Sequence, residues 1–240
     1  MKEKPEKTDY KEVKYTDEHW RLLHTLRERG VKLLSCLETN GLFGAIVHGS
    51  IVRGDVHLGS DVDAFIPRPI AEFQLDAALS SCTYKVYSRV IVQATPAYAP
   101  KVYFILDPEE KMMVSYPLVP LEEREREFYK WGGEAVLEEL QAGMRKPGVN
   151  KALALIIPKS WGHVEVPVEG NESYVAQIIG VSLATVMERV RVLRERREKG
   201  VSGPYLTIEV APEENVSSIV KKLASENPIF RRILAKRGYW

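Results

Sequence analysis

Cysteine is scarce in this chain, with only Cys36 and Cys82 in 240 residues. Their spacing matches neither a zinc-ligand pattern nor a disulfide framework, so we expect free thiols and a cytoplasmic protein. No hydrophobic run reaches membrane-spanning length, and the first residues are charged rather than signal-like. The sequence therefore predicts no membrane partner.

The chain also lacks an excess of charge of either sign. Its net charge is +1, so any surface that binds nucleic acid has to be local. A content of 45% hydrophobic and 28% charged residues is typical of globular proteins. The length suits one large domain or two smaller ones with a sizeable core.

The most informative stretch contains two carboxylates on one predicted strand. An apolar run, Gly44 to Val47, predicts a buried strand, and a turn-rich loop leads from it to a second strand, Asp61 to Ile66. Alternation along this second strand places Asp61 and Asp63 on one face. Two carboxylates at this spacing can hold Mg²⁺, or Mn²⁺ in its place, together with phosphate oxygens.

The residues between the two strands predict a phosphate-binding loop. Gly49 has no side chain to keep a phosphate away from the backbone. Ser50 offers a hydroxyl, and Arg53 can bind phosphate with two parallel N–H groups. The residues alone leave an alternative, in which Gly49-Ser50 is an ordinary turn and both aspartates face solvent on an edge strand.

Two consecutive motifs in this stretch resemble the signature of the DNA polymerase β-like nucleotidyltransferase superfamily. They are Gly49-Ser50-x-x-Arg53-Gly54 and Ser60-Asp61-x-Asp63. The resemblance is strong over residues 44–66 and loose over the first half of the chain. The whole chain is also similar to archaeal predicted nucleotidyltransferases.

This resemblance implies an α/β domain with a mixed sheet, in which Asp61 and Asp63 bind the metal. It also implies that Gly49, Ser50 and Arg53 bind the phosphates of a nucleoside triphosphate, for which we expect ATP. The implied reaction moves a nucleoside monophosphate to a hydroxyl of RNA, protein or a small molecule by two-metal catalysis.

Members of this superfamily have a third carboxylate on a later strand, and this chain departs from that pattern. The later extended runs hold no interior aspartate; they cover residues 84–94, 102–107 and 112–118. Asp107, at the end of the second run, is the best candidate for a third catalytic carboxylate. In the alternative, Asp107 caps the turn before Pro108, and Tyr103 or Ser115 takes the third position.

Helical patterns surround these strands. Residues 1–15 are rich in Lys and Glu and predict an arm that is either loose or extended. A long helix then starts after its N-cap, Thr16, and ends at Asn40-Gly41. Another helix is predicted from Ile70 to Leu79, with Ile70, Phe73 and Ala77 facing inward.

Pro147-Gly148 predicts a linker between two domains. We expect a nucleotidyltransferase domain over residues 1–147 and a smaller α+β domain over residues 148–240. Tyr174 to Val190 has the spacing of a helix-turn-helix, with Gly180 in the turn and Ser182 capping the second helix. The region resembles winged-helix regulators, and the strand 205–210 is either a wing or a sheet partner.

A basic run in this second helix suggests a contact with RNA or DNA. It includes Arg189, Arg191, Arg194, Arg196, Arg197 and Lys199. Because glutamates are interspersed, an ordinary charged helix face explains the run equally well. Two functions remain open: a nucleotidyltransferase, or a nucleic-acid-binding regulator with a degenerate, nucleotide-binding transferase domain. A third carboxylate beside Asp61 and Asp63 distinguishes the first from the second.

Overall fold

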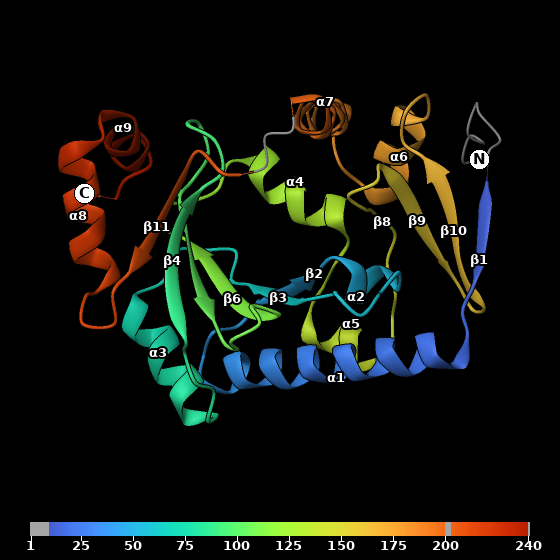
Figure 1. The fold of residues 1–240 in the computed structure, drawn as a ribbon, viewed down its shortest axis with the longest axis horizontal. Coiled ribbons are helices and arrows are strands. Elements are labelled where there is room, and N and C mark those ends of the chain that lie inside the picture. Colours follow the sequence, from blue (N-terminus) through green and yellow to red (C-terminus); the bar gives the residue numbers. More distant parts are fainter. Residues whose placement is uncertain (1–9, 200–202, 240) are drawn as a thin grey trace. The chain divides into compact units, whose positions relative to one another are not determined.

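The computed structural model describes residues 10–199 and 203–239, which form a mixed α/β fold (Figure 1). The chain divides into two units, and each takes three separate segments of the sequence. The first unit consists of the described parts of residues 1–31, 47–62 and 126–202. The second consists of the described parts of residues 32–46, 63–125 and 203–240. The predicted boundary at residue 147 lies inside the first unit.

A four-stranded antiparallel sheet belongs to the first unit. Its strands, in spatial order, are β1 (Lys11–Lys14), β10 (Gly162–Pro167), β9 (Ala154–Lys159) and β8 (Gly148–Val149). In β1, Lys11 pairs with Glu165. Residues 11–14 are therefore extended and not loose, because a partner strand distant in sequence supplies their hydrogen bonds. Residues 1–9 lie outside the described residues.

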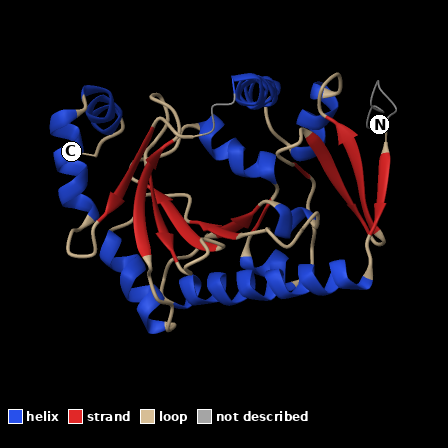
Figure 2. Cartoon of the chain, in the orientation of Figure 1, coloured by secondary structure: helices blue, strands red, loops and turns tan. Residues whose placement is uncertain are grey.

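Two helices joined by a short turn pack with this sheet, at the positions where the sequence predicts a helix-turn-helix. They are α6 (Glu172–Ile179) and α7 (Leu183–Lys199), shown in blue beside the red strands in Figure 2. Gly180 ends α6 in the left-handed conformation, with φ 67°, which glycine adopts without strain. The two helices share a buried apolar cluster with the sheet: Trp131, Val149, Leu153, Leu155, Val166, Val168, Val175, Ala176, Val181, Val186 and Val190.

The rest of the first unit carries the predicted phosphate loop. Its elements are β2 (Ile46–His48), α2 (Ser50–Arg53), α4 (Glu123–Gly132), β7 (Glu134–Ala135) and α5 (Leu137–Gln141). Strands β2 and β7 are antiparallel, with Val47 opposite Ala135. The long helix α1 (Asp17–Thr39) starts in this unit, and the hydroxyl of Thr16 accepts a hydrogen bond from the His19 amide, which confirms the predicted cap.

An antiparallel set of strands forms the centre of the second unit. They are β4 (Ser88–Gln93), β5 (Lys101–Ile105), β6 (Met112–Pro117) and β11 (Leu206–Val210), with β3 (Val62–Phe65) next to β6. The larger, mixed sheet has the order β11-β4-β5-β6-β3-β2-β7. Strand β11 pairs with β4 along its whole length, so it is a sheet partner and not a wing.

The helices of the second unit include α3 (Glu72–Ser81), α8 (Val216–Glu226) and α9 (Pro228–Lys236). The predicted inward face of α3 is wrong: Phe73 is 71% exposed, whereas Leu75, Ala78 and Leu79 are buried. Ile70 lies outside the helix, which begins at Glu72, so a pattern counted from Ile70 selects the wrong side. Within the described ranges, no helix is long and apolar enough to cross a membrane.

A disulfide joins two helices of the second unit. Cys36 in α1 is bonded to Cys82, the residue that ends α3, and the two Cα atoms lie 6.0 Å apart. The expectation of free thiols is therefore wrong. The 46-residue separation gave no indication of this pairing, because only the packing of α3 against α1 brings the two residues together.

Candidate nucleotide site

Gly49 forms an open turn directly after β2. Its φ of 90° is a conformation that favours glycine, and its amide donates a hydrogen bond to the Gly133 carbonyl at 2.9 Å. A Cβ built on Gly49 would meet no atom within 4 Å. The backbone of the loop is therefore approachable on this side, as phosphate binding requires.

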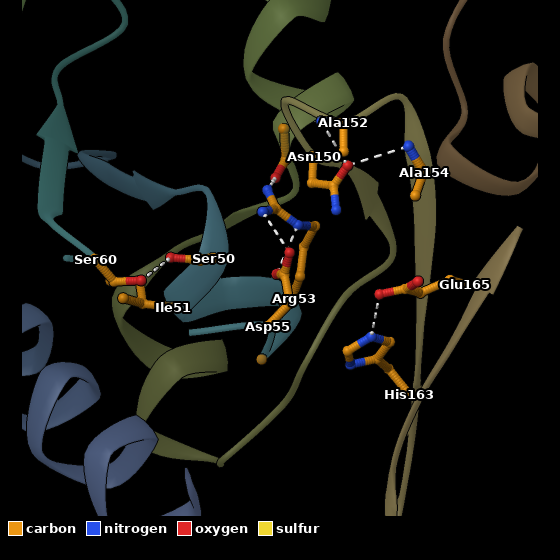
Figure 3. A network of polar contacts seen from close by, with 12 residues as sticks. Ser50, Ile51, Arg53, Asp55, Ser60, Asn150, Ala152, Ala154, His163 and Glu165 are labelled. Atoms are coloured by element: carbon orange, nitrogen blue, oxygen red, sulfur yellow. Dashed lines mark hydrogen bonds and ion pairs between the residues drawn. The ribbon is translucent and has the colours of Figure 1, made fainter. Parts of the chain in front are cut away.

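A serine pair connects this loop to the predicted metal ligands. The Ser50 hydroxyl donates to the Ser60 hydroxyl at 3.1 Å (Figure 3). Ser60 is 5% exposed and also accepts a hydrogen bond from the His57 amide at 2.9 Å. Since Ser60 immediately precedes Asp61, the loop hydroxyl is held close to the start of β3.

The two aspartates alternate with buried apolar residues. Val62 is 1% exposed and Ala64 is fully buried, while Asp61 and Asp63 are half-buried. This alternation agrees with the predicted common face of the two carboxylates. Two partly exposed carboxylates fit a hard divalent cation such as Mg²⁺, which takes oxygen ligands and retains water or phosphate oxygens as further partners.

Arg53 has partners other than the predicted phosphate. Its side chain is 8% exposed, and its Nε and Nη2 donate to the two Asp55 oxygens at 2.9 and 3.0 Å (Figure 3). Its Nη1 donates to the Gly132 carbonyl at 2.5 Å. The guanidinium thus holds the end of α2 against the end of α4, and a phosphate could bind it only by displacing these partners.

The first unit contains another polar network, which no sequence motif indicates. The Tyr15 hydroxyl and His163 Nδ1 are 2.6 Å apart, and His163 Nε2 lies 3.2 Å from Glu165. Burial raises the pKa of Tyr15, so its hydroxyl keeps its proton. Tyr15 and His163 are 148 positions apart, and only the pairing of β1 with β10 brings them together.

Neutral hydroxyls and one ammonium lie on the Asp63 face of the second unit. Tyr103 on β5 pairs with Ser115 on β6, and the Ile66 amide donates to the Ser115 carbonyl at 2.9 Å, which places β6 beside β3. Burial and the nearby charge of Asp63 raise the pKa of Tyr103 to about 12. The Lys101 Nζ lies 5.3 Å from the centre of the Phe65 ring. Sequence reasoning had considered Tyr103 and Ser115 but missed Lys101.

Asp107 caps its own turn. Its carboxylate accepts hydrogen bonds from the Glu109 amide at 2.9 Å and from the Lys111 amide at 3.1 Å. This is the capping alternative stated above, and it occupies one carboxylate oxygen, Oδ1. Among the residues that the structure describes, no group of three or more Asp, Glu, His or Cys side chains is placed to hold a metal ion.

The three arginines predicted to bind nucleic acid have partners within the first unit. The Arg189 guanidinium lies 4.9 Å from the centre of the Phe128 ring. Arg191 pairs with Glu195 at 3.4 Å, and Arg194 pairs with Glu169 at 2.6 Å. These pairs favour the alternative of an ordinary charged helix face. The side chains of Arg191 and Arg194 are nevertheless exposed. The side chains of Arg196, Arg197 and Lys199 lie outside the described residues.

The start of α7 is capped as the sequence predicts, with an additional carboxylate. The Thr185 amide donates to the Ser182 hydroxyl at 3.2 Å. Glu127 accepts from the Ser182 amide and from the Ser182 hydroxyl, each at 2.8 Å, and from the Thr185 hydroxyl. The carboxylate places a negative charge at the end of the helix that would face a phosphate.

Comparisons with known proteins leave the family open: no protein-family model matches the chain, and searches of curated proteins and of solved structures find no match. The likeness to the polymerase β-like superfamily therefore stays a prediction from the residues.

Proposed function

We propose that this protein is a nucleotidyltransferase that binds a nucleoside triphosphate, ATP in the first instance, with Mg²⁺ or Mn²⁺. The observation that supports this most is the hydrogen bond between Ser50 and Ser60 at 3.1 Å, because it holds the glycine-serine turn beside Asp61. The open backbone of Gly49 and the half-buried Asp61 and Asp63 support it further.

Each of these residues has a role that follows from its chemistry. Asp61 and Asp63 hold the divalent cation, and the open turn at Gly49 and the Ser50 hydroxyl orient the phosphates. When bound, the cation neutralises phosphate charge and makes the α-phosphorus more susceptible to attack by an acceptor hydroxyl. Arg53 has a structural role: its guanidinium donates hydrogen bonds to Asp55 and to the Gly132 carbonyl and so fixes the position of α2.

Calorimetric titration with Mg²⁺-ATP tests this proposal. We expect Asp61→Ala and Asp63→Ala each to lower the affinity at least about 100-fold, since each removes a charged ligand. The matched control is Asp107→Ala, which removes a carboxylate of the same size from a turn and should leave the affinity unchanged. Unchanged affinity in the Asp61 variant would refute the proposed site.

A second candidate function is nucleotide-dependent regulation without fast transfer. The observation that favours it is that the Tyr103 hydroxyl lies close enough to Asp63 for the carboxylate to raise its pKa, with Ser115 opposite Tyr103, while Asp107 caps a turn. Incubation with labelled nucleotides and an extract of RNA and protein separates the two candidates. A labelled RNA or protein product indicates a transferase, whereas tight nucleotide binding with no product indicates a regulator.

A further inference from the structure

We propose that the metal site at Asp63 takes one divalent cation rather than two, and that Lys101 of the same unit supplies the second positive charge to the phosphate oxygens bound to that cation. This inference rests on the proposed function and specifies its metal content. It also names a residue that the sequence motif does not contain.

The strand register places Lys101 on the face that carries Asp63. Tyr103 and Ser115 are directly opposite each other, and their side chains share one face with Lys101, two residues before Tyr103. The neighbouring residues Val102 and Phe104 are fully buried on the other face. Lys101 is half-buried at the start of β5.

The Lys101 side chain reaches across β6 toward β3. Its Nζ lies 5.3 Å from the centre of the Phe65 ring, and Phe65 follows Asp63 by two positions on the same face of the strand. A spacing of two residues along a strand is about 7 Å. The ammonium is therefore within reach of phosphate oxygens bound to a cation at Asp63.

The oxygen donors beside Asp63 suit one cation better than two. A second Mg²⁺ needs its own charged oxygen ligand from the protein, whereas Ser115 on the adjacent strand β6 and Tyr103 on the next strand, β5, offer neutral hydroxyls. Ser115 is 3% exposed, and its hydroxyl lies 3.5 Å from the Ala64 carbonyl. A fixed ammonium on this face also repels a second dication while it attracts phosphate.

The test measures metal stoichiometry and nucleotide affinity in the full-length protein. Mn²⁺ is titrated in the presence of a non-hydrolysable ATP analogue, and bound ions are counted by electron paramagnetic resonance. We expect one Mn²⁺ per chain. Lys101→Met should lower the affinity for the analogue about 10- to 100-fold, the effect of losing one charge-assisted hydrogen bond, and Lys101→Arg should restore most of it.

Three further variants provide matched comparisons for this experiment. Lys111→Met removes the same charge from the β5–β6 turn, where Lys111 pairs with Glu109, and should leave the affinity unchanged. Tyr103→Glu adds a carboxylate next to Asp63 and should raise the count to two ions, while Tyr103→Gln should not. Thermal melting identifies any variant that has lost its fold.

The outcomes separate this inference from the function on which it rests. Two Mn²⁺ ions in the wild-type protein, or equal affinities in the Lys101→Met and Lys111→Met variants, would overturn the inference and leave nucleotide binding intact. If the wild-type protein bound no Mn²⁺-nucleotide at all, the proposed function would fail, and the role of Lys101 with it.

Discussion

Among single residues, Gly148 is a glycine that lies very close to another part of the backbone. A Cβ at this position would lie 2.5 Å from the Gly133 nitrogen and 2.7 Å from the Gly132 carbonyl carbon. These atoms belong to the Gly132–Gly133 peptide, and rigid backbone cannot move aside as a flexible side chain can. This close approach fixes the loop behind Gly49, because Gly49 donates its amide to Gly133.

We therefore expect Gly148→Ala to lower the free energy of unfolding by about 2 kcal/mol, the usual cost of overpacking. Gly132→Ala is the matched control, since a Cβ there would have its nearest neighbour at 4.0 Å, and it should change stability by less than about 0.5 kcal/mol. Urea denaturation of both variants measures the difference. Equal stabilities would contradict the close approach.

The Arg53–Asp55 ion pair is a second feature at the residue scale. Its side chains are 8% and 13% exposed, so removing one partner leaves a charge with little access to water. We expect Asp55→Ala to destabilise the protein by about 3 kcal/mol. Glu195→Ala breaks the exposed pair with Arg191, whose side chains are 67% and 44% exposed, and should cost less than about 1 kcal/mol.

Chemical denaturation of the two variants compares a buried and an exposed ion pair directly. If Asp55→Ala were as harmless as Glu195→Ala, Arg53 would not be held as the structure shows. Its guanidinium would then be available to phosphate, as the sequence motif predicts.

At the scale of elements, the disulfide between Cys36 and Cys82 fastens α3 to the end of α1. A cross-link over 46 residues restricts the unfolded chain and stabilises the fold by about 4 kcal/mol in the chain-entropy description. We expect a reducing agent to lower the melting temperature of the wild-type protein. The double variant Cys36→Ser, Cys82→Ser should melt at the lower temperature with or without the reductant.

The cap of α7 makes part of the stability depend on pH. Burial opposes ionisation of Glu127, but hydrogen bonds from Thr185 and Ser182 outweigh it and hold the pKa of this carboxyl below its ordinary 4.5. The unfolded chain therefore takes up the proton first as the pH falls. The stabilisation is complete above the unfolded pKa and is lost as the pH falls through the folded one.

We expect Glu127→Gln to reduce the loss of stability on acidification below about pH 4.5. Thr185→Val removes one hydroxyl donor with little change of volume, so it should give a smaller effect of the same sign. Urea denaturation at a series of pH values measures both slopes. A Gln variant with the pH profile of the wild-type protein would exclude Glu127 as a contributor.

At the scale of the whole molecule, each unit is assembled from segments that are far apart in sequence. Strand β1 pairs with β10 in the first unit, and β4 pairs with β11 in the second. Cutting the chain at residue 147 separates both pairs. We expect neither fragment, 1–147 nor 148–240, to fold alone, as judged by amide dispersion in nuclear magnetic resonance spectra. A well-dispersed spectrum from either fragment would favour the two sequential domains that the sequence predicts.

Features decided by neighbouring residues were predictable from the sequence. These include α1 with its Thr16 cap, the helix pair around Gly180 and the alternation of Asp61 and Asp63 with Val62 and Ala64. Helix capping, glycine turns and strand alternation act over a few residues, so the local pattern is enough to specify them. The candidate loop and its acidic strand belong to this group.

Other features required the tertiary structure. Several contacts join residues that are far apart in the sequence. They are the hydrogen bond from Arg53 to Gly132 in α4, the Cys36–Cys82 disulfide, the pairing of β11 with β4 and the approach of Lys101 to Phe65. The same local pattern is compatible with many long-range pairings, and the burial of apolar surface selects among them only when the whole chain packs. The sequence by itself thus determined the features that depend on neighbouring residues, such as helix caps, glycine turns and the alternation around the two acidic residues, while packing decided which groups surround them.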